Sequence, residues 1–293
     1  MKQILTESVA VSDNINTIDV NSMSNNMPEL PEVETVKAGL SRSWIGKRIE
    51  GVDLRRPNLR FPFPVNLEKD LVGRTIIDVR RRAKYLLIDL DDGQIMLSHL
   101  GMSGKWTIDA TDSNGKHDHV VLYLDDGSIS VYNDPRRFGV LDLFTGDSHK
   151  LLDHLGPEPL EEWGPEDLKA KLSKRKTAIK IAILDQKVVV GVGNIYVCEA
   201  LNRCNISPIR PSNEISIKEC ESLVIEIRKI LAEAIQAGGS TLKDFAGVDG
   251  TLGYFPHQFK VYDKEGSDCE CGGIVERFAQ GGRSTFWCPS CQQ

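Results

Sequence analysis

The chain has 293 residues, of which 40% are hydrophobic and 27% are charged, and 36 basic against 42 acidic side chains give a formal net charge of −6. The length allows two or three small domains, and the composition is that of a soluble globular protein. The negative charge argues against a uniformly basic nucleic-acid binder, so any contact with DNA must depend on local basic patches.

Hydropathy and cysteine content narrow the class of protein further. No apolar run approaches the length that spans a membrane. Seven cysteines occur without a secretory signal, which favours a reducing compartment where thiols bind a metal or pack in the core. No feature of the sequence indicates an oligomer, so a monomer is the default expectation.

Residues 1–26 differ in composition from the rest of the chain. They are rich in Asn, Ser, Asp and Thr, with one lysine and three acidic residues. They lack the charged-then-apolar pattern of a signal peptide and the arginines of a transit peptide. We expect either that these residues form a disordered tail, or that they follow an upstream start codon that is not used for translation.

A helix is predicted to begin within the stretch NNMPELPEVETVKAG. Pro31 stands in its first turn with acidic neighbours, and apolar residues follow at helical spacing. Proline and acidic residues are favoured at the amino end of a helix. The segment before Pro31 is therefore a short lead-in to a helix.

The lead-in also has the form of a translation start, because Met27 is followed by the small residue Pro28. Within a chain, the nitrogen of Pro28 is an amide and cannot act as a nucleophile. At a chain end it would be a secondary amine able to attack an electrophilic carbon, and the adjacent Glu29 could donate a proton. This segment alone favours the simpler interpretation, a helix lead-in without chemistry.

The pattern along the rest of the chain indicates strands followed by helices. Short strand-like runs separated by Asp-Gly and Asp-Asp-Gly turns extend over 48–144, which predicts antiparallel strands in a sandwich or barrel. Helical periodicity follows at 164–176, 177–187, 194–204 and 216–238. A glycine-rich stretch after Gly238 predicts a mobile loop, and a short hairpin begins near Val261. The fold class is therefore α+β with at least two domains.

Four cysteines near the C-terminus predict a structural zinc site: Cys269, Cys271, Cys288 and Cys291. Two close pairs lie sixteen residues apart, and the second pair has the usual two-residue gap. The first pair has a gap of one residue, which is tighter than usual. A reduced hairpin without metal is the alternative, and we favour zinc.

Basic runs and a helix start are candidates for phosphate binding. Gly193 and Asn194 follow Gly191 where a helix begins, and its backbone N–H groups favour an anion, although an ordinary capped turn explains the same pattern. Basic runs at 80–84 and 169–180, and two arginines beside Phe138, are better explained in an acidic protein by a phosphate backbone and a stacked base than by solvated faces.

Two histidines alternate in the run GKHDHVVLY. His117 and His119 would share one face of a strand, but the sequence offers no third ligand to complete a metal site with them. A structural pair or a contact with phosphate is the better interpretation.

Several stretches, in this order and spacing, resemble the bacterial formamidopyrimidine-DNA glycosylase family, also called 8-oxoguanine DNA glycosylase. They are MPELPEVETV, RRAKYLL, HLGMSGKW, KHDHV, DPRRFG, LGPEPL, ILDQKVVVGVGNIY, GYFPHQFKVY and QGGRSTFWCPSCQ, and they run from Met27 to Gln292. PELPEVE favours this branch over the related endonuclease VIII branch. The resemblance implies a helix and antiparallel β-sandwich, then a helix–two-turn–helix module and a zinc-finger β-hairpin.

The resemblance also implies domain boundaries. They are an N-terminal extension over 1–27, a catalytic β-sandwich domain over 28–150, a helix–two-turn–helix domain over 151–238, a lesion-recognition loop over 239–260 and a zinc-finger hairpin over 261–293. One structural Zn²⁺ is implied in the hairpin. The expected location is the bacterial cytoplasm, with double-stranded DNA containing oxidised purines or abasic sites as partner and no membrane.

The catalytic roles implied by the resemblance match the chemistry of the lead-in. Pro28 is the nucleophile that attacks C1′ of the damaged nucleotide, releases the base and forms a Schiff base. Glu29 is the proton donor near the sugar. Lys84 is the donor in the first strand elimination, and Arg283 serves the second, mainly as a phosphate clamp because arginine rarely loses its proton.

Further residues match family contacts to DNA. His117, Arg136, Lys176 and Asn194 match contacts to the DNA strand. Met102, Arg136 and Phe138 match the residues that fill the gap left by a flipped base.

Two alternatives remain open from the sequence. A catalytically silent binder of damaged DNA would result if the nitrogen of Pro28 stayed in an amide bond. A glycosylase that prefers oxidised pyrimidines would share most of the same residues. We predict that the active protein starts at Pro28. The one-residue gap between Cys269 and Cys271 departs from the two residues that are usual in the family.

Overall fold

The computed structural model describes residues 27–110, 114–161, 163–240, 248 and 255–293. The N-terminal half contains α1 (Leu30–Trp44), β1 (Ile49–Leu54), α2 (Leu67–Leu71), β2 (Ile76–Arg82), β3 (Tyr85–Leu90), β4 (Gln94–His99), β5 (Lys105–Thr107), β6 (Asp118–Leu124), β7 (Ile129–Asn133) and β8 (Val140–Thr145). The C-terminal half contains α3 (Pro165–Leu172), α4 (Ile179–Leu184), α5 (Asn194–Arg203), η2 (Ser212–Glu214), α6 (Ile217–Gln236), η3 (Phe255–Gln258), β9 (Glu276–Gln280) and β10 (Arg283–Trp287).

Two antiparallel sheets form the N-terminal half. Their strand orders are β1-β6-β7-β5 and β2-β3-β4-β8, and their facing sides enclose one apolar core. The Asp-Asp-Gly turns end in Gly93 and Gly127, both with positive φ, which glycine adopts without steric cost. The predicted strands and the predicted α+β class are confirmed, and the strands form a sandwich.

Aromatic side chains from the first helix and the β1-β6-β7-β5 sheet stabilise this sandwich. Trp44 is fully buried and donates its indole N–H to Ser130 Oγ at 2.9 Å. Its ring meets Trp106 edge to face, with ring centroids 5.0 Å apart, a geometry that aromatic pairs prefer. The last turn of α1 is thereby fixed to the sheet through packing and a satisfied polar atom.

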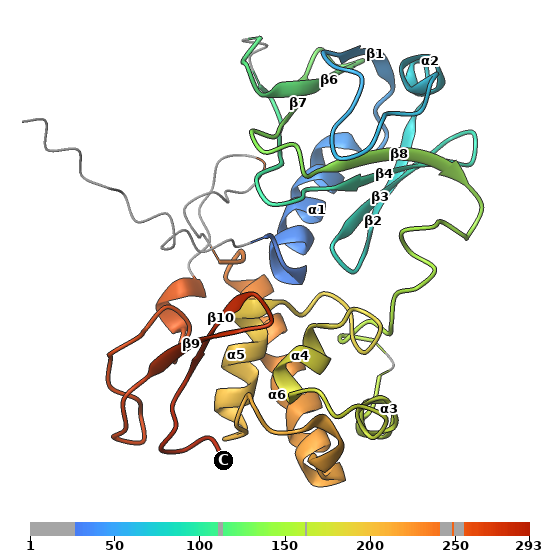
Figure 1. Ribbon diagram of the computed structural model, residues 1–293. Coiled ribbons are helices and arrows are strands. Elements are labelled where there is room, and N and C mark those ends of the chain that lie inside the picture. The colour runs from blue at the N-terminus through green and yellow to red at the C-terminus, as the bar shows by residue number, and fades with distance from the viewer. Residues whose placement is uncertain (1–26, 111–113, 162, 241–247, 249–254) are drawn as a thin grey trace, which may run out of the picture.

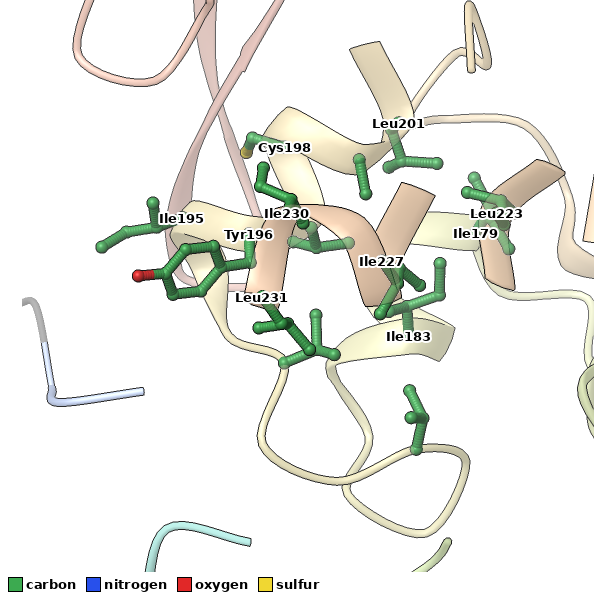
Figure 2. Packing of buried hydrophobic residues seen from close by; sticks show 14 of the residues in the cluster. Ile179, Ile183, Ile195, Tyr196, Cys198, Leu201, Leu223, Ile227, Ile230 and Leu231 are labelled. Carbon is green, nitrogen blue, oxygen red and sulfur yellow. The ribbon is translucent and has the colours of Figure 1, made fainter. Parts of the chain in front are cut away.

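Four helices form a second core in the C-terminal half, and they are the four that the sequence predicts. Figure 2 shows side chains of α4, α5 and α6 packed around Ile227 and Ile230. The longest helix, α6, begins with a capping box in which Ser216 and Glu219 bind each other's backbone N–H groups. The hydroxyl of Tyr196 points away from this cluster, toward the N-terminal half (Figure 2).

The first helix joins the two halves. In Figure 1, α1 lies between the sheets and the helical half, and it packs against both β2 and α6. The β9–β10 hairpin lies beside α5 at the C-terminal end of the chain. The amino end of α1 therefore meets α5 and the hairpin where the two halves come together.

One α-helix was not predicted from the sequence, and two expected segments lie wholly or mostly where the structure does not describe the chain. The five-residue helix α2 was not predicted, because it is shorter than the window that periodicity requires. The N-terminal extension, and most of the loop expected over 239–260, lie outside the described residues. No helix in the described part of the chain has the length and apolarity to cross a bilayer.

Truncating the first tryptophan should test the sandwich core. Trp44→Ala removes the edge-to-face contact and leaves a cavity, so we expect a loss of about 3–5 kcal/mol in the free energy of unfolding. Urea unfolding followed by circular dichroism measures it. Val65→Ala is the matched control, because Val65 is fully exposed and should change stability by less than about 0.5 kcal/mol. Equal stability of the two variants would contradict this account of the core.

Candidate active site and metal centre

A carboxylate at the start of α1 binds the amino end of a helix from the other half of the molecule. Glu29 accepts the backbone N–H of Gly193 at 2.8 Å and that of Ile195 at 3.0 Å, at the start of α5. A side chain at residue 193 would collide with the Glu29 carboxyl carbon, so only glycine fits. The anion at this helix start is thus Glu29 rather than the phosphate that the sequence suggested.

Burial governs the protonation of Glu29. The side chain is 4% exposed, and this burial raises its pKa to about 7, although nearby Lys84 and the two backbone N–H groups act in the opposite direction. The neighbouring carboxylate of Glu32 raises it further. A carboxyl group with a pKa near neutrality is suited to donating a proton at physiological pH.

A second buried carboxylate organises the surroundings of the first. Glu32 accepts the hydroxyl of Tyr196 at 2.7 Å and both the backbone N–H and the hydroxyl of Ser240, at 2.8 and 2.7 Å. Its other oxygen accepts the backbone N–H of Glu29 at 2.9 Å. Glu32 therefore holds the start of α1 against α5 and the residues that follow α6.

Lys84 lies in the tight turn between β2 and β3. The preceding residue, Ala83, has φ +54, a left-handed conformation that costs a non-glycine residue free energy and needs support from its surroundings. Glu158 supplies that support, because its buried carboxylate accepts the Ala83 N–H at 2.6 Å and pairs with Arg81 and Arg82 at 2.8 and 2.9 Å. Three successive residues before Lys84 are fixed by one acidic side chain.

The turn carries Lys84 into a cavity of about 220 Å³. Its lining includes Met27, Lys84, His99 and Arg283, which come from distant parts of the chain. Burial lowers the pKa of Lys84, with Glu29 opposing that effect and Arg283 adding to it. Burial also lowers the pKa of His99 to about 4, so its ring is neutral, and its Nδ1 accepts the N–H of Gly101 at 3.0 Å.

Arg283 reaches this cavity from the first residue of β10. The turn before it consists of Gly281 and Gly282, both with positive φ. The Arg283 side chain is exposed, and the carbonyl of the following residue, Ser284, accepts Asn194 Nδ2 at 2.9 Å. The amide of Asn194, expected to contact DNA, is engaged with the hairpin backbone in this structure.

Pro28 is buried between Met27, which lines the cavity, and Glu29. The Pro28 nitrogen is bonded to Met27, whose atoms line the cavity together with Lys84 and Arg283. Of the four residues expected to be catalytic, Lys84 and Arg283 line the cavity together with Met27, and Pro28 and Glu29 directly follow Met27 in the chain.

The residues expected to fill the gap of a flipped base share another location. Arg136 and Phe138 are exposed, with the guanidinium carbon 5.2 Å from the ring centroid. Buried Asp134 holds their loop by accepting the Gly139 N–H at 2.8 Å and the hydroxyl of Ser103 at 2.6 Å.

Ser103 directly follows Met102, which is half-buried. The backbone N–H of Arg136 donates to Ser103 Oγ at 3.1 Å. The loops that carry Met102, Arg136 and Phe138 are therefore tied together.

The remaining expected contacts divide between surface and interior. Lys176 is exposed and His117 is partly exposed. His119 is buried and its Nε2 lies 2.9 Å from the Asp134 carbonyl oxygen, so the interpretation as a structural histidine is correct for this residue. The His117 and His119 rings are 6.4 Å apart, edge to face.

Two of the basic runs differ from what the sequence suggested. Arg80 pairs with Asp89, and Arg81 and Arg82 pair with Glu158, so these guanidiniums bind acidic groups of the protein itself. Lys180 is fully buried rather than part of a basic surface. The sequence also missed Glu158 and Glu32 as site residues. Glu158 is the acidic residue of the LGPEPL motif, and Glu32 is an acidic residue in the first turn of a predicted helix. Neither position indicates which group the side chain binds.

The four C-terminal cysteines converge. Every pair of sulfur atoms among Cys269, Cys271, Cys288 and Cys291 lies within 4.8 Å. The Cys269–Cys291 and Cys271–Cys288 sulfur distances of 3.9 and 3.5 Å suit four thiolates around one tetrahedral ion. The one-residue gap in the first pair does not prevent this convergence, and the donor set fits zinc.

Comparison with known proteins agrees with this geometry. Residues 27–141 match the formamidopyrimidine-DNA glycosylase N-terminal domain, residues 155–246 match the H2TH domain of the same glycosylase, and residues 270–293 match the zinc finger found in FPG and IleRS. The chain belongs to the formamidopyrimidine-DNA glycosylase family.

Individual relatives span the same length. The formamidopyrimidine-DNA glycosylases of Ruegeria pomeroyi and Phenylobacterium zucineum are 49% and 48% identical, each aligned over 91% of this chain and all of the relative. A Lactococcus lactis FPG variant in complex with Fapy-dG DNA has a TM-score of 0.85 at 34% identity, over 91% of this chain and 100% of that one.

MutM (FPG) of Thermus thermophilus has a TM-score of 0.82 at 38% identity, over 90% of this chain and 98% of that one. The protein is therefore a DNA glycosylase with AP lyase activity in base excision repair, with a zinc-finger hairpin that fits one structural zinc ion.

The metal centre leads to a measurable expectation. The purified protein should contain one zinc ion per chain by elemental analysis, and Cys288→Ser should release it because three thiolates bind more weakly than four. Cys204→Ser is the matched control, since Cys204 lies in the helical half and burial raises the pKa of its thiol to about 12. Equal zinc content in both variants would exclude the four-cysteine centre.

Proposed function

We propose that this chain removes oxidised purines, 8-oxoguanine and formamidopyrimidines, from double-stranded DNA, and then cuts the strand through a Schiff base to Pro28. The observation that carries the proposal is the cavity at which Met27, Lys84 and Arg283 meet, with buried Glu29 beside them. A nucleophile, a proton donor and phosphate-binding cations are the groups that this reaction requires. Its setting is the bacterial cytoplasm.

In the proposed reaction, each bond that forms is matched by a bond that breaks and by a leaving group. The free amine of Pro28 bonds to C1′, the glycosidic bond breaks, and its electron pair leaves with the base, which gains a proton. Opening of the sugar gives an iminium ion. Loss of a proton from C2′ expels the 3′ phosphate, and loss of a further proton from the sugar expels the 5′ phosphate. Water then releases the sugar fragment and restores the amine.

Each charged residue suits one part of this sequence. Glu29, with a pKa of about 7, can donate the proton that opens the sugar. Lys84 has a lowered pKa and can transfer a proton in the first elimination. Arg283 stays protonated and stabilises the charge on the second departing phosphate.

The loops around Asp134 would hold the duplex open. The target base must leave the helix to reach the cavity. Met102, Arg136 and Phe138 supply an apolar chain, a guanidinium and a ring to fill the gap, and His117, Lys176 and Asn194 would contact the strand. Lactococcus lactis FPG has been crystallised with Fapy-dG DNA and with abasic-site DNA, and MutM with carbocyclic 8-oxo-G DNA.

Sodium borohydride trapping tests the Schiff base. A version of the protein that begins at Pro28 should form a permanent crosslink to an 8-oxoguanine duplex, because borohydride reduces the iminium ion. The version from Met1 should form none, because its Pro28 nitrogen is an amide. Mass spectrometry verifies both amino termini.

A thymine-glycol duplex is the control for the lesion. A crosslink to thymine glycol in preference to 8-oxoguanine would point to the glycosylase for oxidised pyrimidines. Tight binding of 8-oxoguanine DNA without any crosslink would favour the alternative that the protein is a catalytically silent binder of damaged DNA.

The protonation of Glu29 predicts a pH profile. If Glu29 donates the proton that opens the sugar, formation of the iminium ion should fall up to about tenfold per pH unit above pH 7, because the raised pKa leaves the carboxyl protonated only below that value. Single-turnover rates between about pH 5.5 and 9, in buffers of fixed ionic strength, measure this pH profile. Glu32→Gln removes a carboxylate that raises the Glu29 pKa, so the descending limb should move to lower pH. A limb that stays in place contradicts the assignment.

A further inference from the structure

Lys180 is a buried cation for which the reaction above has no role. It lies on α4, its side chain is fully buried, and its ammonium donates to the Ser284 carbonyl at 3.0 Å and to Thr285 Oγ1 at 2.7 Å. Both acceptors are uncharged. A fully buried lysine is rare and costs free energy, so its place on the hairpin calls for an explanation.

The contact of Lys180 fixes the residue next to Arg283. The Ser284 carbonyl accepts two side-chain donors, Lys180 Nζ from α4 and Asn194 Nδ2 at 2.9 Å from the start of α5. A carbonyl held by two donors from two helices cannot rotate without breaking both hydrogen bonds. The backbone at the start of β10 is therefore set relative to the helices whose ends surround the cavity.

The turn of the hairpin is seated on the same helix. A Cβ atom at Gly281 would lie 2.6 Å from Ile181 Cδ1, so the turn contacts α4 at the residue after Lys180. Gln280 Nε2 also donates to the Pro208 carbonyl at 3.1 Å. Contacts on both sides of Arg283 thus bind the hairpin to the helical half.

Arg283 needs this support because its own side chain is exposed. Packing around the guanidinium does not hold it, so its placement depends on the backbone from which it extends. We propose that Lys180 is a positioning residue for Arg283, fixing the hairpin so that the guanidinium reaches the second departing phosphate. This inference rests on the proposed function, in which Arg283 serves the second elimination and Lys84 the first.

The two eliminations leave different strand ends, which makes the role separable. Cleavage after the first step leaves an unsaturated sugar on the 3′ end, and cleavage after the second leaves a 3′ phosphate. A displaced Arg283 should slow the second step while Pro28, Glu29 and Lys84 still perform the first. General damage to the protein would slow both steps together.

The test compares Lys180→Met with Lys169→Met on a 5′-labelled duplex containing an abasic site. Methionine keeps the apolar stem of lysine and removes the ammonium. Lys169 is the matched control, since it also donates to a carbonyl, that of Ile215 at 2.5 Å, but from α3. We expect the ratio of the second product to the first to fall about tenfold in Lys180→Met only, with the first cleavage within about twofold of the parent.

Zinc content and thermal unfolding are measured on every variant. An unchanged product ratio in folded, zinc-loaded Lys180→Met overturns the proposal, and so does an equal slowing of both steps. If Lys180→Met loses zinc, Thr285→Val decides, because it removes one acceptor of the ammonium and keeps the side-chain shape. It should lower the same ratio by a smaller factor, and no change overturns the proposal. A parent protein that fails to cut or to trap refutes the proposed function instead.

Discussion

The bond between the Glu29 carboxylate and the amino end of α5 is the contact on which the arrangement of the site depends. It joins residues 164 and 166 positions apart and fixes the start of α1 against the helical half. The helix dipole and two backbone N–H groups offset part of the cost of burying the carboxylate. The offset is incomplete, because the pKa of Glu29 remains raised to about 7. The same burial that locates the carboxyl group therefore keeps a proton available on it.

Further polar contacts join the halves, in addition to the packing of Leu30 in the core of the helical half. Glu158 follows the last strand of the sandwich and binds the backbone before Lys84, while the nearby Gly156 N–H donates to the Gln186 carbonyl at 2.7 Å. These contacts fix the position of Lys84, in the N-terminal half, relative to the loop that leads to α5 in the C-terminal half. Buried ion pairs contribute little net stability, but they demand one geometry, which an apolar contact would not. At this boundary the ion pairs of Glu158 therefore act mainly to fix the relative positions of the two halves, and contribute little to the free energy of folding.

Local signals were sufficient to predict the long helices and the strands of this fold, but not the five-residue helix α2. The alternating runs with Asp-Asp-Gly turns predicted the strands, Pro31 marked the first helix, and the cysteine spacing indicated the metal centre. These features follow from backbone preferences and periodicity within about ten residues. The resemblance supplied the roles of the catalytic residues, and two of them, Lys84 and Arg283, line one cavity with Met27.

Long-range pairing was beyond the reach of the sequence. Lys180 lies in a run of lysines that indicates a solvated or phosphate-binding face, yet its partners are on a hairpin more than a hundred residues later. The α5 start indicated an anion, and nothing nearby showed that the anion is Glu29. At the start of α5 the pattern indicated the right kind of partner, an anion, whereas for Lys180 the indicated surface role was wrong. In both cases the identity of the partner depended on the packing of segments that are distant in the sequence.

The cations around the cavity show how an acidic protein can handle phosphate. Burial lowers the pKa of both Lys84 and Lys180, the nearby Arg283 adds to this effect, and Glu29 opposes it without reversing it. Their environments then separate their uses. Lys84 is buried at the cavity and can exchange a proton, Arg283 is exposed and keeps its charge, and Lys180 is enclosed by the hairpin where it cannot meet substrate. Burial separates the uses of the two lysines, and the guanidinium of Arg283 keeps its charge because arginine rarely loses its proton.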